Sequence, residues 1–535
     1  MSNYSKIFSD AKVKIPNKSA FDMSHITQGT IKTGTLTPAL CEPLLPGDKF
    51  SLGALAEINF APFATQPYGK IDFCMEAFFV PYRILWGGWQ NFITMPENNP
   101  FGSPVVRPTN IPTIQLHKLS SSITYPDDVQ VGTLCDYLGV NGGFAGDQSS
   151  DIKFNILPFL AYHKIYDDWY RNPNIQKPLF VRLAQTGSNP LQSSPWFSAT
   201  YNISGTQDSP GVHTVFPYNF GDGSTILELH QRNWGKDYFT TSQLYPQASG
   251  DVNGSTIDID GATEISISAI RQANVLQKWI ERNNIAGVRY SDQLRATYGV
   301  TPSDAVLDRP IFLGCTRTPV YTKGVKITAG NDSSTNNPYS GQAGATAGSA
   351  LGVSSSSLCD EFTATEHGFV MVIVSVVPHA QYAKGCRRYL KESVVGDIPN
   401  PLLQGLGEQP VYTYELYSGL FAEDTIFGYQ PQYAHYKYHN DEVHGELQDE
   451  ASLASFAIQR SFDEDVALDS EFLKIKTDAL DQVTAVNSNV SNYIAWYNIG
   501  FEFKKISTLS EYVIPTLGEL PNTHTETVPF RGTQL

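Results

Sequence analysis

The residues of this chain best suited to binding a metal lie in the short stretch 433–444. This stretch contains three histidines and two acids, namely His435, His439, His444, Asp441 and Glu442. Imidazole nitrogens and carboxylate oxygens are common ligands of Zn²⁺ and related transition metals. No CxxC or HExxH spacing fixes these side chains relative to one another. The pattern therefore favours an aromatic strand end and turn with solvated histidines, and a metal site is the alternative.

Catalytic motifs are absent from the sequence. It has no GxxxxGK[ST] phosphate loop, no HExxH and no GxSxG nucleophile elbow. The glycine-rich segment 341–352 lacks the GxGxxG spacing of a dinucleotide site. Asp258 and Asp260 resemble part of a calcium loop, but Thr256 stands where the first ligand acid is needed, which favours a hairpin turn. We therefore predict a protein that is not an enzyme and uses no cofactor.

Two groups of cations could contact the phosphates of DNA. The first follows the N-terminus and consists of Lys6, Lys12, Lys14 and Lys18. The second includes Arg387 and Arg388, with Lys384 and Lys391 close by. A flexible basic segment can track a phosphate backbone and become ordered on it, so the first group is the stronger candidate. For the second group, salt bridges on the protein surface are the favoured alternative.

The overall charge excludes bulk attraction to nucleic acid. The chain of 535 residues has 37 Lys and Arg against 53 Asp and Glu, a formal net charge of −16. Phosphate binding needs cations that displace counterions, so any DNA contact must be local or shared with a separate basic protein. The six cysteines show no CxxC spacing, which predicts reduced thiols. Neither a signal peptide nor a membrane span is predicted, because the longest apolar run is only 369–377.

Period-two patterns predict the strands that position these side chains. Residues 50–60 alternate apolar and polar side chains, with Leu55 as the one exception among the polar positions. The pattern repeats over 73–79 and stops at Pro81, and the run 369–377 is typical of a strand buried on both faces. Further strands are predicted over 411–417 and 495–503.

Three segments have the apolar spacing of helices. We predict helices over 157–171, 268–283 and 290–298, and Gly299 ends the last of them. Strands near both ends of the chain, with long excursions between them, predict one domain rather than several. The expected fold class is therefore mainly β, an antiparallel sandwich over residues 1–535 with long inserted loops and a few helices.

Three other segments have the composition of irregular structure. We expect residues 1–40 to form an extended, irregular N-terminal arm. Residues 186–262 are rich in Gly, Ser, Asn, Asp and Pro, which predicts a large insertion that leaves the core and returns. The low-complexity segment 328–357 has one formal charge and one aromatic residue, too little apolar surface to offset the entropy of ordering. We expect it to be a mobile surface loop whose deletion leaves assembly intact.

Several segments together carry a family resemblance. They are LPGDKFSL and FFVPYRILWGGWQNF within 42–93, LCDYLGV at 134–140, LPFLAYHKIYDDWYRNPNI at 157–175, RNWGKDYFTTSQLYPQ at 232–247, the region from IRQANVLQKWIERNN to RPIFLG at 270–314, EHGFVMVIVSVVPHAQYAKG at 366–385 and FGYQPQYAHYKYHNDEVHGEL at 427–447. In this collinear order they resemble the major capsid proteins of microviruses, small single-stranded DNA bacteriophages, and of the gokushovirus branch in particular. RPIFLG departs from the family's usual RPEYLG, and residues 186–230 and 328–357 do not match in detail.

The resemblance implies a structural protein with an eight-stranded antiparallel jelly roll. It implies a T=1 icosahedral shell of 60 copies around a circular single-stranded DNA genome. A small basic DNA-packaging protein, other virion proteins and a host surface receptor are the further partners implied, with no membrane contact. Residues 186–230 are the candidate for a protrusion at the threefold axes. The protein would reside in the virion after assembly in the cytoplasm of a host bacterium.

Two other classes of protein share this architecture. A receptor- or carbohydrate-binding β-sandwich is the main alternative, because jelly rolls also serve as lectins. A glycoside hydrolase would need two carboxylates at a fixed separation across a cleft, and the sequence offers no way to pair them.

Overall fold

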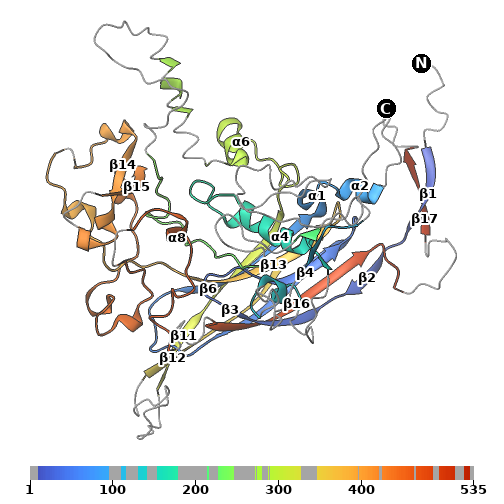
Figure 1. Cartoon of the computed structure of the whole chain (residues 1–535), viewed down its shortest axis with the longest axis horizontal. Coiled ribbons are helices and arrows are strands. Elements are labelled where there is room, and N and C mark those ends of the chain that lie inside the picture. Colours follow the sequence, from blue (N-terminus) through green and yellow to red (C-terminus); the bar gives the residue numbers. More distant parts are fainter. Residues whose placement is uncertain are drawn as a thin grey trace, which may run out of the picture.

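The computed structural model describes residues 10–94, 110–115, 131–140, 153–178, 214–215, 227–245, most of 271–279, 287, 289–326, 346–395, 397–420, 425–462, 466–485, 493–511 and 523–529. Two antiparallel sheets form its centre (Figure 1). One sheet has the order β10 (Ile311–Pro319), β6 (Ile71–Pro81), β13 (Gly368–Pro378) and β4 (Thr37–Leu44). The other has the order β11 (Tyr321–Lys326), β12 (Thr346–Thr363), β5 (Lys49–Phe60), β16 (Ala495–Ser507) and β2 (Ser19–Asp22), and β3 (His25–Ile31) also pairs with β16.

The strand order is that of a jelly roll. If β2 and β11 are left out, the order of neighbouring strands is β3-β16-β5-β12 in one sheet and β4-β13-β6-β10 in the other. Taken along the chain, successive strands change sheet at every step except the one from β6 to β10, which is the winding of a double Greek key. The predicted mainly β, antiparallel sandwich is confirmed. Its described sheets hold four and six strands rather than two equal sets of four.

Shorter elements fill the two long connections. Between β6 and β10 lie α1 (Tyr82–Leu85), α2 (Trp89–Thr94), β7 (Thr113–Gln115), α3 (Leu134–Tyr137), β8 (Lys153–Asn155), α4 (Leu157–Ile165), the π-helix Tyr166–Tyr170, β9 (Thr214–Val215) and α6 (Tyr290–Tyr298). Between β13 and β16 lie β14 (Glu408–Tyr412), β15 (Ile426–Pro431), α7 (Ala434–Lys437), α8 (Ser470–Leu473) and the 3-10 helices Arg388–Leu390, Leu403–Leu406, Thr413–Glu415, Ser418–Leu420, Gly445–Leu447 and Ala454–Phe456.

The helix predictions are confirmed where the structure describes them. The segment 157–171 forms α4 and the π-helix that continues it. The segment 290–298 forms α6, and Gly299 ends it in the left-handed conformation with φ of 70°. The described residues of 271–279 are helical. The strand predicted over 411–417 is wrong beyond Tyr412, because a 3-10 turn replaces it there.

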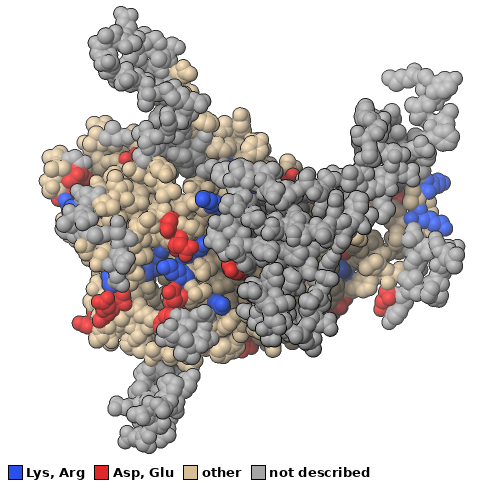
Figure 2. Space-filling view, in the orientation of Figure 1, with Lys and Arg blue, Asp and Glu red and all other residues tan. Residues whose placement is uncertain are grey.

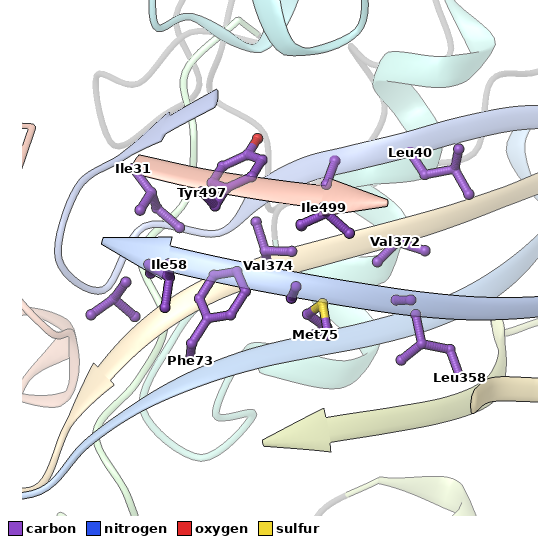
Figure 3. Packing of buried hydrophobic residues seen from close by; sticks show 14 of the residues in the cluster. Ile31, Leu40, Ile58, Phe73, Met75, Leu358, Val372, Val374, Tyr497 and Ile499 are labelled. Carbon is purple, nitrogen blue, oxygen red and sulfur yellow. The ribbon is translucent and has the colours of Figure 1, made fainter. Parts of the chain in front are cut away.

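The sandwich interior follows from the period-two patterns. Side chains from both sheets meet between them, as Figure 3 shows for Ile58 and Tyr497 on one side and Phe73 and Val374 on the other. Burial alternates along β5, and Leu55 on the outward side is 57% exposed. Antiparallel pairing places alternate residues on opposite faces, so local alternation is enough to assign each face.

Strand β13 is buried on both faces, as predicted. Val370, Val372 and Val374 lie in the cluster between the sheets. Phe369, Met371 and Ile373 lie in a second cluster, on the outer side of the four-stranded sheet. Helices α1, α2, α3 and α4 supply many of the other side chains of that cluster. Figure 1 shows α1, α2 and α4 on this side of the sheet.

The predicted insertion 186–262 lies between β6 and β10, but its described residues 227–245 do not leave the body. Leu227 packs in the cluster under the helices, and Tyr238 and Phe239 pack in a third cluster beside β14 and β15. The guanidinium of Arg232 forms an ion pair with Glu76 of β6, at 2.9 Å between Nη2 and Oε1. The expectation of an excursion is therefore wrong for 227–245. Most of the remaining positions of 186–262 lie outside the described residues.

A buried pair of histidines joins this segment to α4. His163 Nδ1 and His230 Nε2 lie 2.7 Å apart, and the His230 ring stacks on Tyr166 with ring centres 4.0 Å apart. The Tyr162 hydroxyl accepts from the His230 backbone N–H and donates to the Leu36 carbonyl, each at 2.8 Å. Burial holds the pKa of His230 well below its ordinary value, and the neighbouring His163 adds to the effect.

This pair predicts acid sensitivity. His230 is neutral in the folded chain but binds a proton near pH 6.5 when unfolded, so unfolding takes up protons below that pH. The free energy of unfolding should fall by about 1.4 kcal/mol per pH unit below 6.5 for this group. Urea unfolding of the isolated subunit between pH 7.5 and 5 measures it. His230→Gln should flatten the profile. An equal slope for this variant and the unaltered protein would contradict the assignment.

The low-complexity segment is the clearest correction to the sequence analysis. Residues 346–357 belong to β12, which pairs with β5 on one side and β11 on the other. Deleting 328–357 would therefore remove much of a central strand, contrary to the expectation of intact assembly. Residues 328–345 lie outside the described residues.

Small side chains are needed here because the two sheets meet at this edge. Thr316 and Thr318 of β10 bond to the hydroxyls of Ser356 and Ser354, at 2.7 and 2.6 Å. At Gly314, where β10 has a bulge, a Cβ would lie 2.0 Å from the Leu358 carbonyl oxygen. The serine-rich composition that mimics a loop is thus the composition of a closely packed edge.

Gly314→Ala should destabilise the fold. The new methyl group cannot fit without displacing the β12 backbone, and overpacking of this kind costs about 1–3 kcal/mol. Gly235→Ala is the matched control, since a Cβ there has nothing within 4 Å, and we expect a change within about 0.5 kcal/mol. Urea unfolding of both variants is the measurement. Equal stability of the two would mean that β10 and β12 are not in close contact.

Candidate nucleic-acid and subunit contact surfaces

The N-terminal segment forms strands rather than an irregular arm. Strand β1 (Asp10–Pro16) pairs in antiparallel fashion with β17 (Thr523–Pro529), which joins the two ends of the chain. Strands β2, β3 and the first part of β4 follow within residues 19–40. The expected irregular arm over 1–40 is therefore wrong from residue 10 onward. Figure 1 shows the two-stranded ribbon of β1 and β17 standing apart from the main sheets.

The four N-terminal lysines have different surroundings. Lys12 and Lys14 lie two positions apart on β1, so they share one face of the ribbon, and both are exposed. Neither forms an ion pair with a described residue. The Lys18 ammonium donates to the Gly47 carbonyl at 2.6 Å and so fixes the base of the ribbon to the body. Lys6 lies outside the described residues.

The second cationic group is largely neutralised within the chain. The Arg387 guanidinium binds the Glu442 carboxylate, with 2.9 Å between Nε and Oε2. Arg388 donates to the Pro410 carbonyl and lies over the Tyr412 ring, 5.3 Å from its centre. These contacts tie the 3-10 turn at 388–390 to β14 and to residue 442. They favour a structural role for Arg387 and Arg388 over contact with phosphate.

The histidine-rich stretch 433–444 does not converge on one point. His435 contacts Gln409 and Glu392, each at 2.9 Å, while His439 contacts the Asn440 carbonyl and His444 contacts Glu442 at 3.1 Å. Burial lowers the pKa of His435, which keeps its ring neutral. Among the described residues, no three His, Cys, Asp or Glu side chains are grouped so as to hold a metal ion. The solvated-turn interpretation holds for His444, whereas His435 is a packed side chain.

Burial suppresses the thiol chemistry of Cys41 and Cys74. None of the six cysteines forms a disulfide. Burial raises the pKa of the Cys41 thiol to about 12 and that of Cys74 to about 11. A thiol of this kind stays protonated at neutral pH and is a poor nucleophile.

The outward face of the six-stranded sheet is a second candidate contact surface, besides the ribbon of β1 and β17. Ile26, Leu55, Val353 and Trp496 are exposed on it, each from a different strand. The register places Gly500 between Leu55 and Ile26 on neighbouring strands. These two exposed apolar side chains therefore flank a position that has no side chain. Contiguous exposed apolar groups rimmed by polar ones are typical of protein contact surfaces.

Comparison with known proteins assigns a family to this architecture. A model of the family described as capsid protein (F protein) matches residues 9–516. This chain belongs to the capsid protein (F protein) family. The match covers both sheets of the sandwich and both long connections.

Individual relatives agree with the family assignment. Capsid protein VP1 of Chlamydia phage 1 is 24% identical, with 95% of this chain and 97% of that protein aligned. Capsid protein VP1 of Bdellovibrio phage phiMH2K is 23% identical over 93% and 95%, and that of Spiroplasma virus 4 is 24% identical over 88% and 90%. The resemblance to gokushovirus-like capsid proteins is confirmed, and the chain is a structural major capsid protein of a phage virion.

Sequence reasoning found the lysines of this capsid protein but missed the strand that carries them. The signal was present, because Lys12, Val13, Lys14 and Ile15 alternate with period two. The partner strand β17 lies at the opposite end of the chain, and no local pattern could have indicated it. None of the described helices is long and apolar enough to span a membrane.

Proposed function

We propose that this capsid protein forms a T=1 icosahedral shell of 60 copies around a circular single-stranded DNA genome, as a structural and not a catalytic protein. The observation that carries the proposal is the family match over 9–516 on a chain with a single sandwich. Sixty identical positions are what the smallest closed icosahedral arrangement offers to one kind of subunit. Many modest contacts, repeated by symmetry, then give a stable particle.

The acidic charge determines how DNA can be held. With a net charge of −16, the chain as a whole repels phosphate, so a few cations must make the contact. Lys12 and Lys14 are the best candidates, because they are exposed on one face of a ribbon and are not engaged in ion pairs with described residues. A small basic packaging protein supplies the remaining positive charge in this proposal.

The remaining partners follow from the same role. Other virion proteins complete the particle, and assembly takes place in the cytoplasm of the host bacterium. A host surface receptor is a further partner in this proposal. A protrusion at the threefold axes is part of the proposed shell. Since residues 227–230 pack in the body, we restrict the candidate protrusion to 186–226.

Purified full-length protein should assemble into shells of one diameter. Electron microscopy and sedimentation of the protein with circular single-stranded DNA are the measurements. Particles whose mass corresponds to 60 subunits support the proposal. A protein that remains a single subunit under all conditions and binds a carbohydrate would instead favour the receptor- or carbohydrate-binding alternative.

Replacing Lys12 and Lys14 together by Ser should reduce the DNA content of particles more than their yield. The logarithm of the DNA-binding constant falls linearly with the logarithm of the salt concentration, and each phosphate contact contributes a slope of about 0.7 on single strands. Loss of both lysines should therefore reduce the slope per subunit by about 1.4. The ratio of absorbance at 260 and 280 nm measures the DNA content. The control is Lys177→Ser with Lys236→Ser, which removes the same charge from two exposed positions in the body. Equal loss of DNA in both variants would show a general charge effect and remove the ribbon from the DNA contacts.

A further inference from the structure

The ribbon of β1 and β17 has two chemically different faces. In an antiparallel pair, directly opposite residues point to the same side and neighbours along a strand point to opposite sides. One face therefore carries Lys12 and Lys14, with Thr525 opposite Lys14. The other carries the aliphatic side chains of Val13 and Ile15, opposite Glu526 and His524. The first face is basic, and the second combines two aliphatic side chains with one acid and one histidine.

The face that carries Val13 and Ile15 lacks a cover within the described part of the chain. Neither β1 nor β17 belongs to one of the two main sheets, and Val13 is 42% exposed. A two-stranded ribbon by itself is at best marginally stable in water, so such a ribbon normally needs a third strand or a packing surface. Its two outer edges also leave backbone groups available for pairing.

The base of the ribbon is held in a way that directs it outward. Only Asn17 and Lys18 separate β1 from β2, the edge strand of the six-stranded sheet. Lys18 is bonded to Gly47, and the His524 ring contacts the Asn17 side chain at 3.0 Å. The ribbon therefore extends past the edge of its own sandwich, as Figure 1 shows for β1 and β17 beyond β2. In a closed shell, the surface beyond the outline of one subunit belongs to the next subunit.

We propose that the Val13 and Ile15 face of the ribbon docks on a second copy of this chain and acts as a clasp between neighbouring subunits. The opposite face, with Lys12 and Lys14, then stays open. The inference rests on self-assembly of the capsid protein, but it does not depend on the shell having 60 copies or on DNA being bound by the lysines. Burial of aliphatic side chains supplies the attraction, and symmetry repeats the contact at every subunit.

Photocrosslinking identifies the molecule that docks on the Val13 and Ile15 face. With p-benzoylphenylalanine in place of Val13, irradiated particles should give a covalent dimer of the capsid protein on a denaturing gel. The same group in place of Lys12, on the opposite face, should give at least fivefold less dimer. Crosslinks confined to one chain, or to DNA, at position 13 would overturn the proposal. So would equal dimer yields from the two positions.

A pair of double variants separates the clasp from the DNA contact. Val13→Ser with Ile15→Ser should raise the protein concentration needed for half-maximal shell formation at least tenfold, a change of about 1.4 kcal/mol per contact. The melting temperature of the isolated subunit and the DNA content per surviving shell should stay unchanged. Lys12→Ser with Lys14→Ser should leave the assembly concentration within twofold. Unaltered assembly of the Val13 and Ile15 variant would overturn the clasp, whereas failure of the unaltered protein to form shells would instead contradict the proposed function.

Discussion

A strand that is apolar on both faces needs other elements packed against each face. Strand β13 is such a strand, so the rest of the structure must cover both of its faces. The opposing sheet covers one face through residues such as Ile58 and Tyr497, and α1 to α4 cover the other. The covering helices come from the long connection between β6 and β10. This connection is therefore part of the core, and Arg232 with Glu76 and His163 with His230 hold its later part in place.

Closure of the sandwich at its β10 and β12 edge follows a different rule. There the sheets approach so closely that hydroxyl pairs and glycines replace the large side chains of the centre. Hydrogen bonds between Ser and Thr satisfy polar groups in a space too narrow for Leu or Phe. An edge of this kind is stable because of fit and hydrogen bonding, so its composition does not show the hydrophobicity expected of a core strand.

These two rules leave particular surfaces open for assembly. The outward face of the six-stranded sheet exposes Leu55, Ile26 and Trp496. The terminal ribbon exposes Val13 on one face and Lys12 and Lys14 on the other. In contrast, Arg387 and His435 make contacts within the chain. A capsid subunit must reserve contact surface for its neighbours, and the sandwich does so at one sheet face and at its joined chain ends.

The sequence by itself determined what depends on near neighbours. Alternation over 50–60, 369–377 and 495–503 predicted core strands, and Gly299 predicted the end of a helix, because strand and helix periods are local. The collinear motifs also predicted the capsid family. Only the tertiary structure decided that residues 346–357 form a core strand, that β1 pairs with β17 and that Arg387 is neutralised by Glu442. Each of these depends on a partner far away in the chain, and the chemistry of one segment does not specify which distant segment it will meet.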